Sequence, residues 1–541
     1  MKLQVLTFLG FITVGSGDVF THEESEDIKG YLETMMGCHN IPGLTIAVIK
    51  GNDSWTLPLG YADTAAKRAV TDETLFGIGS ITKSITATLI AVMIDESEGK
   101  ITFDTPVSEL LGVGYQFPDD FQTRETTIKD VLSHRTGIAA LNLAMLFGIP
   151  PGISREDFSK LVGMMTSKPF RGEMLYSNFM YMLAGHITEK VWGASWEENL
   201  KTKLFQKIGM ASTEAISGDA DITGDKYARP YVYLRGEVVE GDPSPFDIST
   251  VGPAGGLATN IKDKVKFMRF MLNKGKLENG TQLIKEATLQ QLWQPVIPLP
   301  PFVVFMMERL SPQWPVADIS TGYGMGWFKN VYRGRRNMWH AGGLHSYNSL
   351  LWLFPDSDMG LHISMNGPTS SSSKSPQNML VSALYYVTDI LLGETPWLDR
   401  ETVCTFPKPW LDLAMFMPPP DKDDTPIKPE YPLSEYAGSY FNPLVGEFSV
   451  TFDKSTDQLQ VKLNKLDGVL VPKRDGSFGL ECKGVYEFLT WPEKDNPMYM
   501  YNAVFIRGAD SFDGVDLVMA IPIDSPIRFQ VQRVDDVKTE L

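Results

Sequence analysis

Apolar residues along the first 400 positions recur with the helical period in some segments and at every second position in others. Thr21 and Glu24 form a capping-box pattern at the start of the first such helix. The expected helices span 22–36, 80–97 and 376–392, and the expected strands span 44–49, 55–61, 323–330, 337–341, 348–354 and 360–365. Because strands lie on both sides of a largely helical middle, the pattern predicts one α+β unit over 18–400, whose sheet combines both ends of the segment.

A proline-rich segment and a change of pattern separate the end of the chain from this unit. Between Phe406 and Pro432 there are eight prolines, which fix φ and lack a backbone donor, so 401–432 is predicted to be a linker or surface strap. Short strand-like runs then span 446–453, 459–463, 468–472, 478–482, 486–490, 503–507, 517–521 and 527–531. This spacing predicts an all-β barrel or sandwich over 433–541.

The first seventeen residues have the layout of a secretory signal. Lys2 precedes the apolar stretch Leu3–Val14, and small residues follow up to Gly17. This predicts a signal peptide over 1–17 and a secreted, extracellular protein, with a buried first strand or helix as the alternative. Asn52 and Asn279 lie in Asn-x-Ser/Thr sequons and are therefore glycosylation candidates.

Charge and cysteine content exclude several classes of protein. The 541 residues include 49 Lys and Arg against 66 Asp and Glu, a net charge of −17, so no nucleic-acid partner is expected. No later apolar run approaches the roughly 18 residues needed to span a bilayer. Cys38, Cys404 and Cys482 are too few for a disulfide framework, and at most one pair can bridge. No cluster of ligand side chains suggests a metal, and no cofactor is expected.

Ser80 is the first candidate for chemistry, because it lies where a glycine-containing turn, Gly77–Gly79, enters a helix. Lys83 follows one turn later on the same helix face. A serine hydroxyl becomes a nucleophile when a neighbouring base takes its proton, and a lysine serves when burial lowers its pKa. The helix start also directs backbone N–H groups at developing negative charge. The pattern is weak alone, since it recurs at Ser371–Lys374.

Two further motifs supply candidate partners for this serine. Tyr176 suits a general base or proton relay, and Asn178 suits a residue that fixes the lysine or a substrate amide. His340 lies at the end of an expected strand and is followed by Gly342 and Gly343, which allow a substrate to lie against that strand near a backbone N–H donor. Each motif is weak alone, and a lone histidine at a strand end is more often structural.

Together, in this order, Ser80-x-x-Lys83, Tyr176-x-Asn178 and His340-x-Gly342 resemble the motifs of the serine β-lactamase-related family. That family includes class C β-lactamases, DD-peptidases, D-aminopeptidases and esterases. The resemblance covers about residues 20–395 and includes the phrases Ile41–Val48, Phe76–Ser80, Leu132–Gly137, Pro253–Thr259 and His340–Gly343. It implies a β-lactamase/transpeptidase-like fold, with an antiparallel sheet flanked by helices plus a helical subdomain. The phrase Leu433–Tyr440 resembles the start of the lipocalin-like β-domain that often follows such hydrolases.

The resemblance also implies roles for individual residues. Ser80 would be the acylated nucleophile, Lys83 and Tyr176 would share proton transfer, and Asn178 would orient them. The backbone N–H groups of Ser80 and Gly343 would form the oxyanion hole. His340 replaces the lysine that begins this motif in β-lactamases. A neutral imidazole is a weaker anchor for a substrate carboxylate, which argues against β-lactamase activity itself.

Two histidines near these motifs receive no catalytic role from the sequence. His134 lies within the phrase Leu132–Gly137, which the family does not use for catalysis, and is expected to be structural. His345 follows the third motif closely but is assigned no role.

The main functional hypothesis is a secreted serine hydrolase that cleaves a small peptide, amide or ester through an acyl-enzyme on Ser80. The alternative is an extracellular matrix component associated with shell or mineral, because secreted animal members of the family include shell-matrix proteins of the gigasin kind. Against direct mineral nucleation, the acidic residues are dispersed along the chain and form no long runs.

Overall fold

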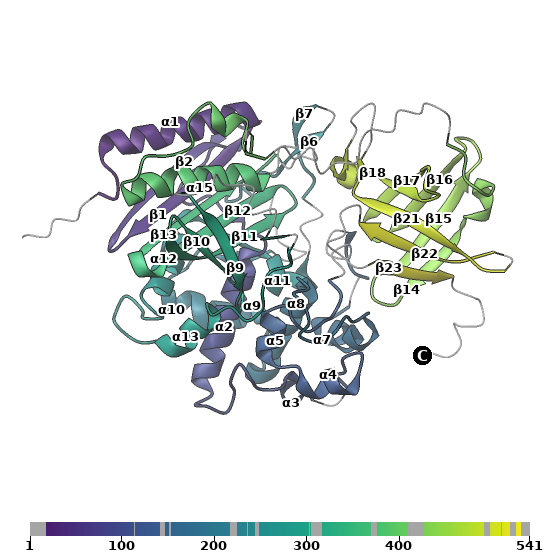
Figure 1. Cartoon of the computed structure of the whole chain (residues 1–541), viewed down its shortest axis with the longest axis horizontal. Coiled ribbons are helices and arrows are strands. Elements are labelled where there is room, and N and C mark those ends of the chain that lie inside the picture. The colour runs from purple at the N-terminus through teal and green to yellow at the C-terminus, as the bar shows by residue number, and fades with distance from the viewer. Residues whose placement is uncertain are drawn as a thin grey trace, which may run out of the picture.

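The computed structural model describes residues 18–112, 114–140, 147–150, 153–216, 224–234, 236–243, 248–301, 303–304, 316–368, 376–408, 410–411, 427–491, 498–509, 511–519 and 526–531. The expected signal peptide, residues 1–17, and the second Ser-x-x-Lys pattern, Ser371–Lys374, lie outside these described residues. The described part contains a β-sheet with helices on both faces and a separate barrel beside it (Figure 1).

The sheet has eight antiparallel strands in the order β3-β2-β1-β13-β12-β11-β10-β9. Their bounds are β1 Gly43–Lys50, β2 Asp53–Asp63, β3 Arg68–Ala69, β9 Asp318–Tyr323, β10 Phe328–Tyr332, β11 Arg335–Leu344, β12 Tyr347–Phe354 and β13 Met359–Met365. Strand β1 pairs with β13, with Leu44 opposite Met365, so the sheet joins the two ends of the unit. This confirms the expected α+β fold with a combined antiparallel sheet.

Side chains of the central strands alternate between the two faces of the sheet, as a period of two requires. On β1, Leu44, Ile46 and Val48 pack in one core, whereas Ala47 and Ile49 pack in the other. The first core includes α1 and α15, which lie together on one side of the sheet (Figure 1), and the second includes α2 and α12. The helix bounds are α1 His22–His39, α2 Ile81–Glu96, α12 Ile261–Leu272 and α15 Pro376–Leu392. Helix α1 begins with the expected capping box of Thr21 and Glu24.

The middle of the chain is largely helical, and most of its helices lie below the sheet in Figure 1. Its helices are α3 Val107–Leu111, α4 Asp120–Glu125, α5 Ile128–Leu132, α7 Arg155–Lys160, α8 Asn178–Trp192, α9 Trp196–Asn199, α10 Gln206–Ile208, α11 Gly252–Gly255 and α13 Glu286–Leu292. Shorter pieces connect them: η1 Leu161–Met164, η2 Leu200–Phe205, η4 Ser249–Val251, β4 Phe76–Gly77, β5 Glu214–Ala215, β6 Tyr231–Leu234, β7 Glu237–Glu240 and β8 Leu257–Thr259.

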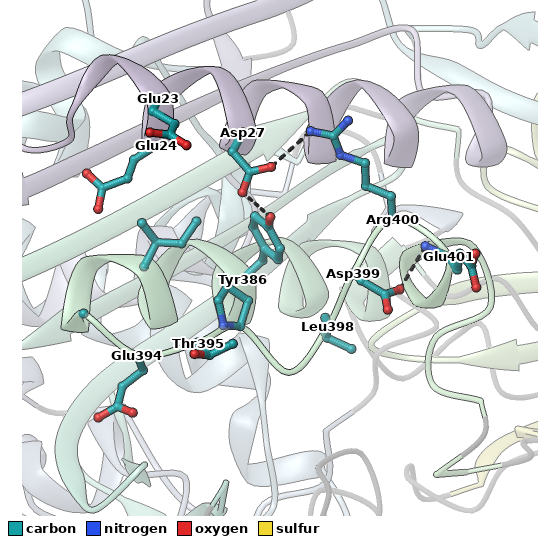
Figure 2. Close-up of a pocket in the computed structure, with 13 residues that line it drawn as sticks. Glu23, Glu24, Asp27, Tyr386, Glu394, Thr395, Leu398, Asp399, Arg400 and Glu401 are labelled. Carbon is teal, nitrogen blue, oxygen red and sulfur yellow. Dashed lines mark hydrogen bonds and ion pairs between the residues drawn. The ribbon is translucent and has the colours of Figure 1, made fainter.

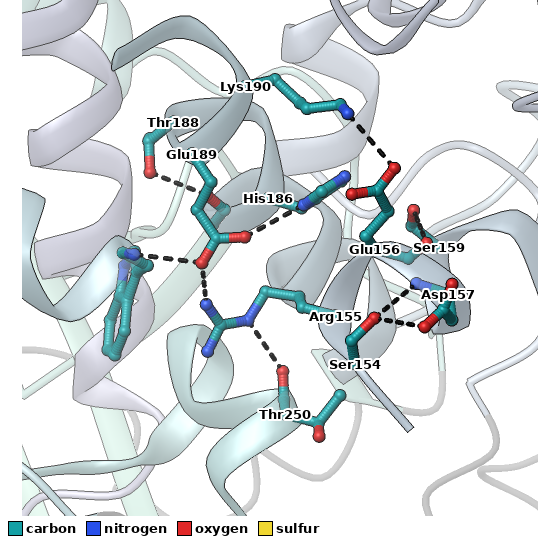
Figure 3. A network of polar contacts seen from close by, with 12 residues as sticks. Ser154, Arg155, Glu156, Asp157, Ser159, His186, Thr188, Glu189, Lys190 and Thr250 are labelled. Carbon is teal, nitrogen blue, oxygen red and sulfur yellow. Dashed lines mark hydrogen bonds and ion pairs between the residues drawn. The ribbon is translucent and has the colours of Figure 1, made fainter. Parts of the chain in front are cut away.

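A network of charged groups fixes α8 against its neighbours (Figure 3). Arg155, the first residue of α7, pairs with Glu189 on α8 and, at 2.9 Å, with Glu197 on α9. Its Nε also donates to the carbonyl of Thr250 at 3.0 Å, and Glu189 lies 3.0 Å from Nδ1 of His186. Because the arginine is mostly buried and uses several donors, the network sets the position of α8, which begins at Asn178.

The structure contradicts two of the expected strands. The run 323–330 is interrupted, because β9 ends at Tyr323 and β10 begins at Phe328. Gly326, with φ of +80°, lies in the turn between them, where a left-handed backbone reverses the chain. The run 486–490 forms the 3₁₀ helix η9 (Gly484–Leu489) and only then a short strand, β19 (Thr490–Trp491), which pairs with β20 (Met498–Tyr499).

The C-terminal part forms a closed barrel, which confirms the expected all-β fold. Its strands are β14 Gly438–Asn442, β15 Gly446–Asp453, β16 Gln458–Leu463, β17 Leu466–Pro472, β18 Phe478–Lys483, β21 Tyr501–Arg507, β22 Phe512–Met519 and β23 Ile527–Val531. Aromatic and aliphatic side chains such as Tyr440, Phe448 and Phe529 are buried in it. The division at residues 400 and 433 stays a prediction, and 412–426 of the expected linker lie outside the described residues.

Two contacts tie distant parts of the chain together. A disulfide joins Cys38, near the end of α1, to Cys404 in the 3₁₀ turn η6 (Thr402–Cys404), across 366 residues of sequence. This pair is the one bridge that three cysteines allow, and Cys482 is a buried free thiol in the barrel. The barrel contacts the helical region through Phe147, which packs against Tyr486 and Tyr501 with ring centroids at 5.2 and 5.7 Å.

Candidate active site

The turn that carries Ser80 lies directly against strand β11. Ser80 is the N-cap residue of α2 and follows Gly79, whose φ is +49°. A Cβ at Gly79 would lie 2.6 Å from the backbone nitrogen of Gly343, and a Cβ at Gly342 would lie 1.8 Å from the carbonyl oxygen of Ile78. These approaches leave no room for side chains at Gly79 and Gly342. They bring the exposed backbone of Gly343 beside Ser80.

Lys83 is fully buried and contacts Ser80 directly. Its Nζ lies 2.9 Å from Oγ of Ser80, 2.6 Å from Oδ1 of Asn178 and 2.7 Å from the carbonyl oxygen of Ala254. No carboxylate of the described residues pairs with it. Burial lowers the pKa of Lys83 well below its usual value. The amide and carbonyl oxygens can only accept hydrogen bonds, so a neutral amine that donates to both directs its lone pair at the Ser80 hydroxyl.

Tyr176 and Asn178 reach this lysine from the start of α8. Nζ of Lys83 lies 4.7 Å from the centre of the Tyr176 ring. Burial raises the pKa of Tyr176, and a side-chain hydrogen bond with Ser80 offsets this only in part. The phenol therefore keeps its proton at neutral pH, which suits a relay or a proton donor and disfavours a phenolate base. Asn178 is the first residue of α8, and its Oδ1 accepts the lysine hydrogen bond.

His340 is buried on β11 and both of its ring nitrogens are engaged. Nδ1 lies 2.7 Å from the carbonyl oxygen of Ala341, so this nitrogen carries the hydrogen. Nε2 then accepts the hydroxyl of Tyr323 at 3.2 Å. Burial, followed by the nearby Lys83 charge, lowers the pKa of His340 to about 3, so the imidazole is neutral.

An apolar cluster lies beside the catalytic candidates. It contains Met174, Ile297, Leu299 and Tyr323, which are buried, and Tyr176, Val303, Val304 and Phe328, which are partly buried and pack against them. The segment 295–304 therefore packs at the site through Ile297, Leu299, Val303 and Val304.

All seven site residues expected from the three motifs come together here: Ser80, Lys83, Tyr176, Asn178, His340, Gly342 and Gly343. Sequence reasoning missed the carbonyl of Ala254 and the hydroxyl of Tyr323. Ala254 lies in the segment Pro253–Thr259, which is part of the resemblance to the family. The residue types of that segment do not indicate that a backbone carbonyl accepts a hydrogen bond from a lysine. Asn52 and Asn279 lie elsewhere, exposed on turns.

A cavity of about 830 Å³ lies apart from these residues, between α1 and the end of α15 (Figure 2). Six of its thirteen lining residues are acidic, and one of them, Asp27, accepts a hydrogen bond from Tyr386 at 2.5 Å and pairs with Arg400 at 3.1 Å. Helices α1 and α15 cover the face of the sheet opposite α2, so this cavity is not part of the Ser80 site. Within the described ranges, no group of His, Cys, Asp or Glu is arranged to hold a metal ion.

Comparison with known proteins supports the resemblance to the serine β-lactamase-related family. An unguisins hydrolase of Aspergillus campestris is 26% identical over 468 residues, covering 83% of this chain and 80% of that protein. Gigasin-6 of Magallana gigas is 27% identical over 243 residues, covering 43% of this chain and 78% of its own. The structure of an octameric penicillin-binding protein homologue from Pyrococcus abyssi superposes with a TM-score of 0.57 at 21% identity, covering 93% and 99% of the two chains.

Residues 28–385 match the family model described as Beta-lactamase. This match spans well over half of the chain and includes the Ser80, Tyr176 and His340 motifs. The resemblance inferred from those motifs is thereby confirmed: the chain belongs to the beta-lactamase family, whose members are serine hydrolases.

Proposed function

We propose that this protein is a secreted serine hydrolase that cleaves an amide or ester through an acyl-enzyme on Ser80. The observation that carries the proposal is the environment of Lys83. Its Nζ lies 2.9 Å from the Ser80 hydroxyl, while two pure acceptors, on Asn178 and Ala254, take the two hydrogens of the neutral amine. A buried lysine without a carboxylate partner among the described residues is suited to be a neutral base at physiological pH.

In this mechanism, the Lys83 amine takes the proton of Ser80 as Oγ attacks the carbonyl carbon. The backbone N–H groups of Ser80 and Gly343 donate to the carbonyl oxygen as it becomes negative. When the C–N or C–O bond breaks, Tyr176 gives its phenolic proton to the leaving group and regains one from the Lys83 ammonium. Water then attacks the acyl carbon, releasing the carboxylic acid and restoring the Ser80 hydroxyl.

The substrate is proposed to be neutral and apolar near Tyr176. His340 presents no positive charge to a substrate carboxylate, because it is neutral and both ring nitrogens have partners. Val303 and Val304 are half-buried beside Tyr176, and an unpaired carboxylate next to apolar side chains loses hydration without compensation. Two p-nitrophenyl esters of equal length, one ending in methyl and one in carboxylate, test this. We expect kcat/KM to be at least about tenfold higher for the neutral ester.

Secretion is supported by the signal-like first seventeen residues and by the disulfide between Cys38 and Cys404, since disulfides persist in oxidising compartments. Exposure of Asn52 and Asn279 leaves both sequons accessible to glycosylation. N-terminal sequencing of the protein from expressing cells checks this. We expect a medium-exported chain beginning at Asp18, and a chain retained inside the cell with Met1 would refute it.

A second candidate function is an extracellular matrix role associated with shell or mineral. The similarity to gigasin-6 supports this alternative, although it covers 43% of the chain. The two roles are compatible, because a matrix protein can keep an intact acyl-transfer site. Extraction of native tissue separates them: protein that remains in an insoluble extracellular fraction supports the matrix role.

Covalent labelling tests the hydrolase. The purified protein is treated with a fluorophosphonate or a penicillin-type probe, and the modified residue is located by mass spectrometry. We expect the adduct on Ser80 and none on Ser80→Ala. Ser84→Ala is the matched control, because its hydroxyl lies on the same helix but donates to the carbonyl of Gly326. A correctly folded wild-type protein without a Ser80 adduct contradicts the proposal.

A further inference from the structure

We propose that His134 is a positioning residue that holds Tyr176 and the start of α8 in register with Lys83. The inference rests on the proposed Ser80 mechanism and deepens it. His134 is completely buried and has a left-handed backbone with φ of +59°. A histidine adopts this conformation at a cost, so the surrounding contacts must hold it there.

A ladder of backbone hydrogen bonds leads to this residue. It joins 135–139 to 166–171, with Ala139 N–H donating to Thr166 at 3.0 Å, Lys168 N–H to Gly137 at 2.8 Å, and Arg171 N–H to Arg135 at 2.9 Å. At the next step the carbonyl of His134 accepts the N–H of Leu175 at 2.8 Å. The loop of His134 is therefore fixed to the segment that carries Tyr176.

The side chain of His134 adds one more step to this ladder. Its Nδ1 accepts the backbone N–H of Ser177 at 3.1 Å. Ser177 is the N-cap residue of α8, and its N–H is buried, so without this acceptor it would lack a partner. The imidazole thus fixes the residue between Tyr176 and Asn178.

The ring of His134 also contacts the catalytic tyrosine. The ring centroids of His134 and Tyr176 lie 4.4 Å apart, and Tyr181 and Tyr323 lie at 5.2 and 5.1 Å. Tyr323 in turn donates to His340. The imidazole therefore occupies the space behind Tyr176 and limits how far its phenol can move from Ser80.

The buried environment of His134 favours a neutral imidazole, which can accept a hydrogen bond. Burial, followed by the proximity of the titratable groups of Lys83 and His340, lowers the pKa of His134 well below its usual value. Nδ1 accepts from Ser177, so the hydrogen lies on Nε2. Protonation would place a second hydrogen against the Ser177 N–H and a positive charge near Lys83, and both changes would disrupt the site.

A buried carboxylate also anchors this loop. Asp130, on α5, is fully buried and binds Arg135 at 2.5 Å and Arg171 at 2.7 Å. Arg135 follows His134, and Arg171 lies five residues before Tyr176. Asp130 therefore joins the loop of His134 to the segment that leads to Tyr176. Because this connection is held at both ends, the His134 side chain can set the position of Tyr176.

The test uses leaving groups of different pKa, because Tyr176 supplies a proton only to leaving groups that need one. For His134→Ala we expect kcat for aryl esters with poor leaving groups, such as p-methoxyphenyl, to fall by about 10- to 100-fold with little change in KM. For p-nitrophenyl esters we expect a loss of less than about threefold. Asparagine tolerates a left-handed backbone and offers an acceptor to Ser177, so His134→Asn should restore part of the lost rate.

His39→Asn is the matched control, because this buried histidine ends α1, on the face of the sheet opposite α2, and bonds to the carbonyl oxygen of Val403. It should leave the leaving-group dependence of kcat unchanged. An equal loss for all leaving groups, or a change in thermal stability alone, would overturn the role of His134. Failure of the wild-type protein to acylate Ser80 would instead overturn the proposed function, so the two failures are distinguishable.

Discussion

Lys264 shows how a single buried side chain sets the pH dependence of stability. It lies on α12 with no exposed surface, and its Nζ has no hydrogen-bond partner among the described residues. Burial lowers its pKa from 10.5 to about 7, and the neighbouring charge of Asp263 offsets this only in part. His362, on β13, is buried close to it, and burial followed by the Lys264 charge lowers the pKa of His362 well below its usual value.

We predict that Lys264→Met stabilises the protein at neutral pH. The unfolded chain protonates this lysine below about pH 10.5, whereas the folded protein does so only below about pH 7. The penalty therefore grows as pH falls from 10.5 to 7 and stays constant below that. Urea denaturation at pH 7, 8.5 and 10 should show a gain of a few kcal/mol at pH 7 that shrinks as pH rises, on the order of 1.4 kcal/mol per unit.

Lys262→Met is the control, since this lysine lies on the same helix, is exposed and pairs with Glu73. It should give no gain at any pH. A gain from Lys264→Met that does not depend on pH would show that the benefit comes from packing and not from removal of a buried titratable group.

At the residue level, the sequence identified the proposed nucleophile and its lysine, because Ser80 and Lys83 are neighbours on one helix and their spacing alone places them together. It assigned His134 a structural role only. The contact between His134 and Ser177 forms because two loops that are distant in sequence meet, and the spacing of neighbouring residues cannot predict such a meeting. Lys264 is buried because helical spacing places it on the face of α12 that carries Ile261, Met268 and Met271.

At the element level, β11 passes so close to the Ser80 turn that Gly342 has no room for a side chain, whereas the adjacent Gly343 does. A Cβ at Gly342 would lie 1.8 Å from the carbonyl of Ile78 and 2.6 Å from Oγ of Ser349. A Cβ at Gly343 would meet nothing closer than Oδ1 of Asn348, at 3.7 Å. The two positions differ in available space although they are adjacent in sequence.

We therefore predict that Gly342→Ala destabilises the protein by about 1–3 kcal/mol or more, because the strand must move away from the turn. Gly343→Ala should melt within about 0.5 kcal/mol of the wild type. Thermal unfolding followed by circular dichroism measures both variants. Equal melting temperatures for the two variants would show that β11 does not lie against the turn as the structure has it.

Strands were predicted well where the run is mainly apolar, as in 348–354, or where apolar residues alternate with others, as in 360–365. The expectation over 323–330 failed because apolar residues continue through the turn, and only the left-handed backbone at Gly326 reveals the reversal. The run 486–490 failed for a different reason. Tyr486 and Phe488 are buried in the barrel core, so their alternation reflects burial, whereas hydrogen bonding follows the 3₁₀ pattern.

At the scale of the whole molecule, the disulfide between Cys38 and Cys404 connects the first helix to the segment that leaves the sheet unit. We predict one thiol in the denatured, unreduced protein and three after reduction. Reduction should lower stability by about 2–4 kcal/mol, because the unfolded chain regains the freedom of a long loop. Thiol titration and thermal melts with and without reductant measure this, and three thiols before reduction would contradict it.

The barrel and the helical region meet through a segment of four described residues, 147–150. Phe147 is completely buried against Tyr486 and Tyr501, its carbonyl accepts the N–H of Lys465 at 3.1 Å, and Asn464 donates to the carbonyl of Gly148 at 2.7 Å. The core that contains α2 and α8 therefore continues into the barrel. This continuity predicts that the two parts unfold together.

Removing the ring of Phe147 should uncouple the unfolding of the barrel from that of the helical region. Phe147→Ala removes the ring that packs against Tyr486 and Tyr501, at a cost of about 3–5 kcal/mol, but leaves the sheet core and the barrel core intact. Calorimetry should then show two separate transitions in place of one, with the loss confined to the weaker unit. Phe121→Ala is the control, because Phe121 is 55% exposed and contacts Phe170 on the surface. One transition in Phe147→Ala at the wild-type temperature would show that other contacts couple the barrel to the hydrolase unit.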